Sequence, residues 1–356
     1  MIGYDRFVQD VWYEPHKEFR PVRCAFCNGM LFRGVVEKVE IKCSRCGAIQ
    51  VVQHNGNSCV QKRETPRHLP ERSGYVPHRM VTDSAGRLVT IPRHPKRVVI
   101  LNSSNVGLYL AAGGKPVGRV SSVLPADLEG ELARIPEVGL PTNPDLKSIM
   151  ALKPDLVIGM AFPVHQSLAS VLERKGIPAI LQTFDRYADI LEALRFYGEL
   201  NGSQNLAAEK IAAIEQHRLR LLTQIGGQPS PRVLIVWAID GGVYAALSGS
   251  FIGDLVKRLG GVNLFDLLMP KTEKTAYAPL DIEVITEIQP DVILIIDHEF
   301  SEKASQGNQT WQHPTWRELN AVRQNRVYQL PYLLFAVNPG ARIKKALSIL
   351  SAFLYG

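Results

Sequence analysis

Four cysteines near the N-terminus have the spacing of metal ligands. Cys24 and Cys27 form one Cys-x-x-Cys pair, and Cys43 and Cys46 form a second pair after fifteen intervening residues. The two-residue gap lets both thiolates of a pair reach one ion at about 2.3 Å, and two pairs complete a tetrahedral site. The spacing therefore predicts one structural zinc on these four side chains. Iron bound by the same thiolates is the alternative.

Two disulfides are the other use of four cysteines, and the N-terminal sequence argues against them. It does not show the basic, apolar and small-residue regions of a secretory signal, so we expect a reducing, cytoplasmic location. The fifth cysteine, Cys59, is then expected to be an unpaired, reduced surface thiol.

The segment around these cysteines, about residues 20–52, resembles the Com family of zinc fingers from Mu-like prophages. Leu31 follows Cys27 at the family's spacing, and the segment ends on Ile41-Lys42-Cys43-Ser44-Arg45-Cys46, with Ser44 where the family usually has proline. Com proteins bind messenger RNA, so the resemblance implies a zinc ribbon that contacts RNA or DNA. Ribbons of this type also serve as structural staples, and for this chain we favour the staple.

Two stretches of the chain are near copies of each other. Residues 145–158 recur as 281–294, 136 positions later, and 97–101 recur as 232–236, 135 positions later. Each longer copy has the pattern of a short amphipathic helix, a Pro-Asp turn and a β-branched run. Such a run is typical of a parallel strand covered on both faces. Two repeats at nearly one offset predict two equivalent α/β lobes with a cleft between them.

The predicted organisation has five parts. Residues 1–58 form the zinc ribbon, and the charged, proline-bearing segment 59–80 is a linker. Residues 81–186 form the N-terminal α/β lobe, and 227–356 form the C-terminal lobe. Between them, 187–226 carry apolar residues at helical spacing, which Asn201-Gly202-Ser203 could bend, so we expect one long helix or two successive ones.

Composition is that of an ordinary soluble protein. Of 356 residues, 46% are hydrophobic and 21% charged, and the apolar runs are well short of the roughly 20 residues that span a bilayer. The formal net charge is +7, of which residues 1–80 supply +5. This charge is too modest to favour nucleic-acid binding. We expect a monomer without a membrane span.

Polar and aromatic residues in the loops after the predicted strands are the candidate ligand-binding groups. Aromatic rings beside a few polar and cationic groups suit a large, flat, partly anionic ligand. The candidates are Ser103, Ser104, Asn105, Phe162, His165 and Arg186 in the first lobe, and Trp237, Tyr244 and Tyr277 in the second.

Five of these positions have a specific expected role, and for His165 and Arg186 there is also a plainer alternative. The run Ser103-Ser104-Asn105 begins a helix whose free amides favour an anionic group. His165 is either an axial ligand of haem iron or an ordinary loop residue. Arg186 either clamps a carboxylate or phosphate or is a solvated charge. No spacing of a nucleophile and a base indicates catalysis, so no enzyme is expected.

Residues 81–356 resemble the iron-siderophore, haem and vitamin B12 substrate-binding proteins of ABC transporters. The resemblance begins with Val81-Thr82-Asp83-Ser84-Ala85-Gly86 and continues through Pro95-Lys96-Arg97-Val98-Val99. Further matching segments are Ile-Pro-Glu-Val-Gly at 135–139, Leu-Lys-Pro-Asp-Leu-Val-Ile at 152–158, Lys-Gly-Ile-Pro at 175–178, Tyr-Gly-Glu-Leu-Asn-Gly at 197–202, Gly-Gly-Val-Asn at 260–263 and Arg-Val-Tyr at 326–328.

That resemblance implies a class III periplasmic-binding-protein-like fold, in which a single long helix joins two pseudo-duplicated lobes and limits their opening. It implies a ferric siderophore, haem or cobalamin as ligand, an ABC permease as partner, and a periplasmic or extracytoplasmic location. The absence of a recognisable secretory signal favours the alternative, a cytoplasmic ligand sensor whose zinc ribbon contacts RNA, DNA or a protein.

Overall fold

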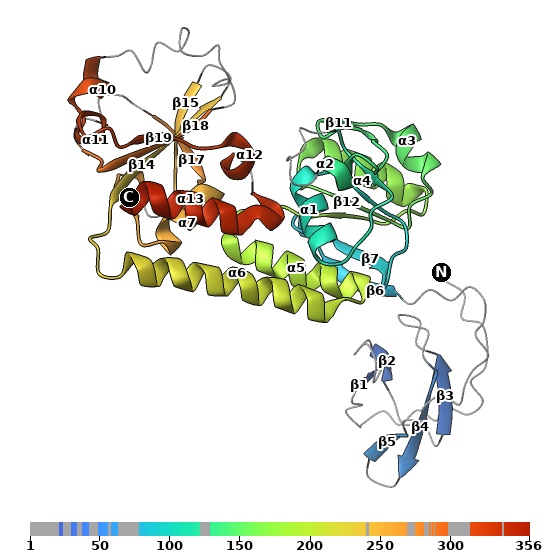
Figure 1. Ribbon diagram of the computed structural model, residues 1–356. Coiled ribbons are helices and arrows are strands. Elements are labelled where there is room, and N and C mark those ends of the chain that lie inside the picture. Colours follow the sequence, from blue (N-terminus) through green and yellow to red (C-terminus); the bar gives the residue numbers. More distant parts are fainter. Residues whose placement is uncertain are drawn as a thin grey trace. The chain divides into compact units, whose positions relative to one another are not determined.

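The computed structural model divides the chain into two compact units, Met1–Arg79 and Met80–Gly356 (Figure 1). The residues it describes are 21–23, 30–33, 38–42, 49–55, 58–62, 78–121, 129–239, 242–268, 275–280, 285, 287, 289–297, 314–336 and 338–356. Cys24, Cys27, Cys43 and Cys46 lie outside these residues, so the zinc site stays a prediction.

The described part of the first unit consists of short antiparallel strands. β1 (Pro21–Arg23) pairs with β2 (Met30–Arg33), and a second sheet has the order β3 (Lys38–Lys42), β4 (Ile49–Asn55), β5 (Ser58–Lys62). Residues 59–62 were expected in the linker. They form the last strand instead, because they pair in register with β4.

The first lobe (lobe 1, residues 80–186) is built on a four-stranded parallel sheet. The order is β13 (Ala179–Leu181), β12 (Leu156–Gly159), β8 (Val98–Ile100), β9 (Gly118–Arg119), preceded in the chain by the hairpin of β6 (His78–Thr82) and β7 (Leu88–Pro92). Its helices are α1 (Ser103–Ala111), α2 (Glu129–Leu132), α3 (Leu146–Ala151) and α4 (Pro163–Arg174), and β10 (Gly139–Leu140) pairs with β11 (Asn143–Pro144). The inner strands are buried throughout, as their unbroken apolar runs predict.

The second lobe (lobe 2, residues 227–356) has a mixed sheet. The order is β17 (Tyr277–Pro279), β15 (Gly242–Ala246), β14 (Arg232–Ile239), β18 (Val292–Asp297), β19 (Val327–Gln329), and β16 (Val262–Asn263) also pairs with β14. Its helical segments are α7 (Phe251–Arg258), η1 (Leu264–Leu267), α10 (Pro314–Glu318), α11 (Asn320–Arg323), α12 (Tyr332–Phe335), η3 (Gly340–Arg342) and α13 (Ile343–Tyr355).

The duplication predicted from the repeats is confirmed by strand order and register. β13-β12-β8-β9 in lobe 1 corresponds to β19-β18-β14-β16 in lobe 2, and all of these neighbours are parallel. Val98 pairs with Leu156, and Val233 pairs with Val292. These pairs are related by the same offsets of 135 and 136 that the repeats show. Lobe 2 adds the antiparallel strands β15 and β17 at its edge.

The Pro-Asp turns of the two lobes have similar backbone angles. Lys153 and Gln289, which precede the two prolines, have positive φ values of 45° and 39°. A positive φ is uncommon for residues other than glycine, so its recurrence at equivalent positions marks one turn structure used twice. Of the helix expected at 281–288, the structure describes only positions 285 and 287, so the comparison rests on the turns and strands.

The connecting segment 187–226 contains two helices that run antiparallel. α5 (Tyr187–Asn201) ends at Gly202, whose φ of 69° terminates a helix readily, and α6 (Gln204–Ile225) then runs back along it (Figure 1). A Cβ built at Gly198 would lie 2.5 Å from that of Ala207, so the glycine permits the close contact. Only α6, about 33 Å long at 1.5 Å per residue, extends from one lobe to the other.

One hydrophobic cluster runs through both lobes and the helices that join them. Its buried members include Ile100 of β8, Tyr197 of α5, Val233 of β14 and Leu350 of α13. This shared core holds the cleft-forming loops of the two lobes on one framework. No helix among the described residues combines the length and the apolar character needed to cross a lipid bilayer.

Candidate functional site

A pocket of about 810 Å³ opens between the two lobes. Five parts of the chain line it: the β6–β7 turn, the loop after β12, the loop after β13, one face of α5, and the turn before α7. The lining residues are Val81, Thr82, Asp83, Ser84, Ala161, Phe162, Ile180, Gln182, Thr183, Phe184, Asp185, Arg186, Asp189, Glu192, Ala193, Phe196, Ser248 and Gly249. The loops after β12 and β13 leave the carboxyl ends of parallel strands, where open α/β sheets place their ligands.

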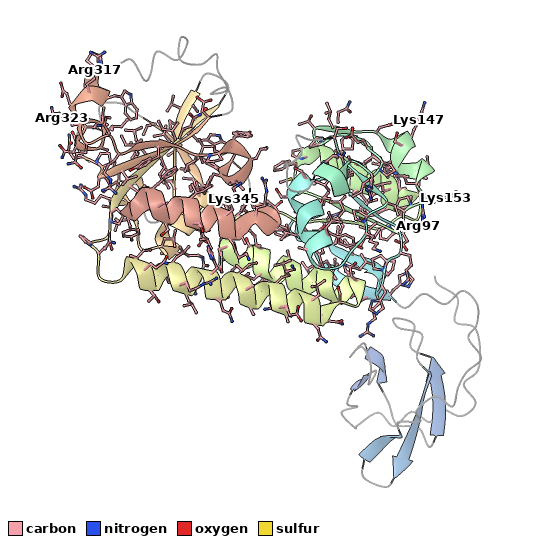
Figure 2. The ribbon with its side chains drawn as sticks, viewed as in Figure 1. Arg97, Lys147, Lys153, Arg317, Arg323 and Lys345 are labelled. Carbon is pink, nitrogen blue, oxygen red and sulfur yellow. The ribbon has the colours of Figure 1, made fainter. Side chains whose placement is uncertain are left out.

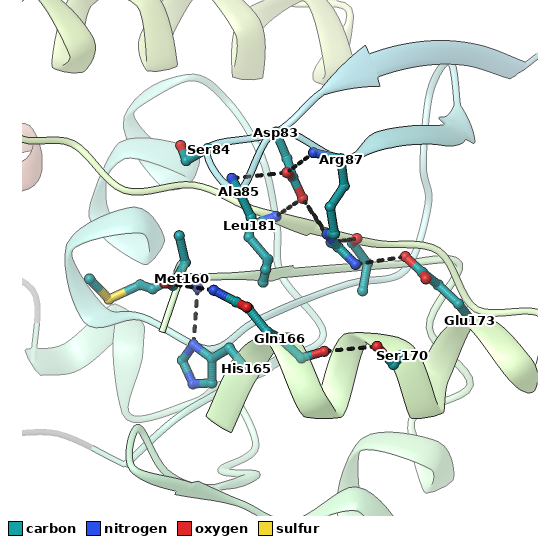
Figure 3. A network of polar contacts seen from close by, with 12 residues as sticks. Asp83, Ser84, Ala85, Arg87, Met160, His165, Gln166, Ser170, Glu173 and Leu181 are labelled. Carbon is teal, nitrogen blue, oxygen red and sulfur yellow. Dashed lines mark hydrogen bonds and ion pairs between the residues drawn. The ribbon is translucent and has the colours of Figure 1, made fainter. Parts of the chain in front are cut away.

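Asp83 ties the β6–β7 turn to the end of β13 (Figure 3). Its buried carboxylate accepts a hydrogen bond of 3.1 Å from the amide of Leu181 and forms an ion pair of 2.7 Å with Arg87. Arg87 also pairs with Glu173 of α4 at 3.0 Å. The amide of Thr183 is bonded to the hydroxyl of Ser84 at 3.0 Å. This wall of the pocket is therefore held by charged hydrogen bonds, which are stronger than neutral ones.

His165, expected as an axial-ligand candidate, is a structural residue of lobe 1. The imidazole is 1% exposed; its Nδ1 accepts from the amide of Met160 at 3.0 Å, and its Nε2 lies 2.8 Å from the carbonyl of Pro141 (Figure 3). Since Nδ1 is the acceptor, Nε2 carries the proton and donates. Burial lowers the pKa of His165 below its usual value, so the neutral ring is favoured. Neither nitrogen is available to iron.

Phe162 occupies the expected position in the cleft. It is the N-cap residue of α4, lines the pocket, and is 49% exposed. Its ring stacks on the ring of His165 at 6.5 Å, and the amide of neighbouring Ala161 donates to the hydroxyl of Thr183 at 3.0 Å. A fixed loop thus presents an exposed aromatic face to the pocket, which suits contact with a flat ligand.

Arg186 also lines the pocket, but its charge has a partner within the protein. The guanidinium pairs with Asp189 at 3.2 Å while remaining 67% exposed. The same carboxylate accepts from the backbone amides of Asp185 and Arg186 at 3.0 and 2.9 Å. Arg186 is therefore part of the cap at the start of α5, and a ligand anion would have to compete with Asp189 for it.

The amides at the start of α1 are not free, contrary to expectation. The side-chain oxygen of Asn102, the N-cap residue, accepts from the amides of Ser104 and Asn105 at 2.8 and 3.2 Å. The Ser104 hydroxyl donates to the carbonyl of Asn338 in lobe 2 at 2.8 Å. Ser103 is exposed, but none of the three residues expected here lines the pocket. This helix start joins the lobes.

Trp237, Tyr244 and Tyr277 lie in strands of lobe 2, whereas loops were expected. Trp237 of β14 pairs with Tyr244 of β15, and the rings of Trp237 and Tyr277 are 4.4 Å apart. Strands β15 and β17 have no counterpart in lobe 1, so the comparison of the two repeats could not predict them. None of the three side chains lines the pocket. Burial raises the pKa of Tyr277, and the charge of Asp185 in lobe 1 adds to the rise.

Several pocket residues were not among the sequence candidates. Asp189, Glu192 and Phe196 follow Asp185 at intervals of four, three and four residues, so they share one face of α5. That spacing is readable from the sequence once the start of the helix is known. The contribution of Asp83 was not readable, because it depends on pairing between segments almost a hundred residues apart.

Comparisons with known proteins agree with the fold. The family model described as periplasmic binding protein matches residues 98–332. The chain is 25% identical over 224 residues to the high-affinity heme uptake system protein IsdE of Staphylococcus aureus, covering 62% of this chain and 75% of that protein.

Solved structures show the same architecture. An ABC transporter substrate-binding protein from Listeria monocytogenes superposes with a TM-score of 0.63 at 25% identity, over 74% of this chain and 99% of that one. Staphylococcus aureus SirA complexed with staphyloferrin B has a TM-score of 0.65 at 19% identity, over 78% of this chain and 98% of that one. Since the family model spans well over half of its length, the chain belongs to the periplasmic binding protein family.

Proposed function

We propose that this protein binds a metal chelate or macrocycle, a ferric siderophore, haem or cobalamin, in the pocket between its lobes and presents it to an ABC permease. The observation that carries the proposal is the pocket itself, which lies between the lobes at strand ends and is lined in part by aromatic rings. Its volume of about 810 Å³ is in the upper part of the range of about 300–1,000 Å³ typical of ligand sites.

The side chains present favour a metal that arrives with its own chelator. Among the described residues, no three His, Cys, Asp or Glu side chains are grouped so as to hold a metal ion. One similar protein is named for heme uptake, and a solved structure of the same fold is complexed with staphyloferrin B. The cytoplasmic location expected from the N-terminal sequence gains no support from a family of periplasmic binding proteins.

The test is titration of the full chain with haem, cobalamin and a panel of ferric siderophores, after recording the visible spectrum and metal content of the native protein. We expect one of these ligands to bind more tightly than about 100 µM. Phe162→Ala should weaken that binding about 2- to 10-fold through lost aromatic contact. Leu219→Ala, which removes a similarly exposed apolar side chain from α6, is the matched control and should leave it unchanged. If every ligand of the panel bound more weakly than about 100 µM, the proposal would be wrong.

For the first unit we propose one structural zinc on Cys24, Cys27, Cys43 and Cys46, carried by the two Cys-x-x-Cys pairs. Elemental analysis of protein purified without chelators should find about one zinc per chain, and Cys43→Ser should lower it. Cys59→Ser is the matched control, because Cys59 lies outside both pairs. Iron in place of zinc, or a full metal content in Cys43→Ser, would contradict the assignment.

A further inference from the structure

We propose that the pocket selects a chelate carrying positive charge, of the class of amine-bearing ferric trihydroxamates, over anionic ligands such as haem or a ferric tris-catecholate. The inference rests on the proposed function of the pocket as the ligand site. It reverses the sequence expectation of a partly anionic ligand, and it follows from which charged groups line the pocket and which of them are already paired.

Carboxylates outnumber cations in the pocket. Asp83, Asp185, Asp189 and Glu192 line it, and among the residues that the structure describes Arg186 is the one Arg or Lys side chain in its lining. Two of the carboxylates are matched inside the protein, Asp83 by Arg87 and Asp189 by Arg186. In the part of the chain that the structure describes, Asp185 and Glu192 have neither an ion pair nor a side-chain hydrogen bond of their own.

Both unmatched carboxylates line the pocket. Asp185 precedes Arg186, the N-cap residue of α5, and Glu192 lies on the face of the helix that meets the pocket. Burial and the neighbouring charge of Asp189 both raise the pKa of Asp185, although Arg186 opposes the rise. A cation entering the pocket would relieve the repulsion between Asp185 and Asp189, whereas an anion would add to it.

Several backbone amides that could hold an anion near the pocket are already bonded within the protein. At the start of α5 the carboxylates of Asp189 and Asp254 accept from backbone amides, the latter from Tyr187 at 2.8 Å. The start of α1 is capped by Asn102, and that of α7 by the Ser250 hydroxyl, which accepts from the Gly253 amide at 3.1 Å. Free amides at helix starts are a common anion site, and the amides bonded in these three caps are not offered to a ligand. The start of α4, at the pocket-lining Phe162, has no side-chain cap.

The cationic side chains labelled in Figure 2 lie outside the lining of the pocket. Arg97, Lys147 and Lys153 are at the outer edge of lobe 1, Arg317 and Arg323 are at the outer edge of lobe 2, and Lys345 is on α13. None of these lines the pocket. They therefore do not compensate the carboxylates that a ligand would meet.

The ligand class follows from charge arithmetic on the chelate. Three hydroxamates neutralise one ferric ion, so a free ammonium group leaves the complex cationic at neutral pH. Haem carries propionates, and three catecholates give iron a large negative charge. The apolar body of a trihydroxamate can contact Phe162 and Phe196, and its ammonium can approach Asp185 and Glu192.

The decisive experiment compares ferrioxamine B with its N-acetyl derivative by calorimetric titration of the full chain. The two chelates hold iron identically and differ by one charge. We expect the acetylated form to bind about 5- to 10-fold more weakly. Asp185→Asn and Glu192→Gln should each weaken ferrioxamine B about 2- to 10-fold and leave its acetyl derivative unchanged. Glu209→Gln, at an exposed carboxylate of α6 outside the pocket, is the matched control.

Each outcome decides a different claim. Equal affinity for the two forms, or tighter binding of haem or a ferric tris-catecholate than of ferrioxamine B, would overturn the charge inference and leave the proposed function standing. Failure of every chelate and of haem and cobalamin to bind would overturn the proposed function and the inference with it. Loss of affinity in the Asn and Gln variants for both forms of ferrioxamine alike would also overturn the inference, because a charge-specific contact must discriminate between them.

Discussion

His165 shows why a residue type that can ligate iron is not by itself a ligand. The ring is buried in lobe 1, and its two nitrogens satisfy the amide of Met160 and the carbonyl of Pro141. A buried backbone group that loses its hydrogen-bond partner keeps the full cost of desolvation. The imidazole therefore stabilises this loop through its two hydrogen bonds as well as through its packing. The loop it holds is the one that presents Phe162 to the pocket.

His165→Ala should lower the free energy of unfolding by about 2–4 kcal/mol at neutral pH, because two buried backbone groups lose their hydrogen bonds. Urea unfolding followed by circular dichroism measures this change. His165→Gln, which can still accept and donate, should cost less than His165→Ala. Equal losses in the two variants would show that packing of the ring, rather than its hydrogen bonds, stabilises the loop.

The pKa of the same residue predicts a pH dependence. Burial lowers the pKa of His165 in the folded protein below the ordinary value of about 6.5. As the pH falls, His165 therefore binds a proton more readily in the unfolded chain than in the folded one. Its contribution to stability is complete above about pH 6.5 and is lost as pH falls through the folded pKa. The fall in unfolding free energy between about pH 7.5 and about pH 5.5 should be smaller in His165→Gln than in the natural protein. A residual fall is expected from His217, whose pKa is also lowered by burial.

The candidate site was predictable from the sequence only in part, and for reasons that are visible residue by residue. Phe162 and Arg186 follow strands and line the pocket as expected. The partner of His165 could not be read from the sequence, because Pro141 reaches the imidazole only through the folding of its loop. The pairing of Arg186 with Asp189 could be expected only once the start of α5 was known, since the two residues are three apart at that helix start. An unpaired charge and a paired charge look the same in a sequence, which is why the sign of the pocket's charge was missed.

At the scale of elements, the repeated Pro-Asp turn fixes where each second strand begins. Asp155 accepts hydrogen bonds from the amides of Lys96 and Arg97 at 2.6 and 2.9 Å. Asp291 accepts from the amide of Arg232 at 2.8 Å. Asp155 thus aligns β12 with β8 in lobe 1, and Asp291 aligns β18 with β14 in lobe 2.

Asp155→Ala should lower the free energy of unfolding by about 1–3 kcal/mol, since two backbone amides lose a charged acceptor. Asp291→Ala should cost less, because one such bond is lost. Chemical denaturation of the two single variants and the natural chain, run side by side, measures the difference. A larger loss in Asp291→Ala would mean that the two turns do not stabilise their lobes in the same way.

The helical pair α5–α6 depends on the absence of a side chain at Gly198. A methyl group there would meet the Cβ of Ala207 at 2.5 Å, so the helices must separate or bend. Gly198→Ala should therefore destabilise the protein by about 1–3 kcal/mol, despite the better helix propensity of alanine. Gly202→Asn is the matched control: its φ of 69° suits asparagine and its Cβ meets nothing within 4 Å. Thermal unfolding of both variants checks the difference, and a stabilised Gly198→Ala would contradict it.

For the whole molecule, the fold could be predicted much further than the site. The offsets of 135 and 136 residues between repeats reappear as equivalent strand registers in the two lobes. The apolar periodicity could not show that residues 187–226 fold back on themselves, because one long helix and two antiparallel helices have the same apolar spacing. The positive φ of Gly202 ends α5 and allows α6 to run back along it. The sequence analysis did not predict strands β15 and β17, because the repeated segments do not show that one lobe contains additional strands.

The continuous core has a further consequence for how the lobes unfold. Ile100 in lobe 1 and Val233 in lobe 2 belong to one buried cluster, joined through α5, α6 and α13. Two lobes that share a core should lose their structure in one transition rather than in sequence. The protein should then behave as a single cooperative framework around the pocket, with α6 limiting independent motion of the lobes.

Ile100→Ala tests this, because it destabilises lobe 1 while a probe in lobe 2 reports the result. The side chain is fully buried, so its truncation should cost about 2–5 kcal/mol. In a Trp12→Phe background every remaining tryptophan lies in residues 227–356, at positions 237, 311 and 316. Ile100→Ala should therefore move the tryptophan fluorescence transition to lower urea by as much as it moves the circular dichroism transition. Leu267→Ala, at a side chain that is 71% exposed in lobe 2, should move neither. A fluorescence transition that stays in place while circular dichroism becomes biphasic would show that the lobes unfold independently and that the shared core does not couple them.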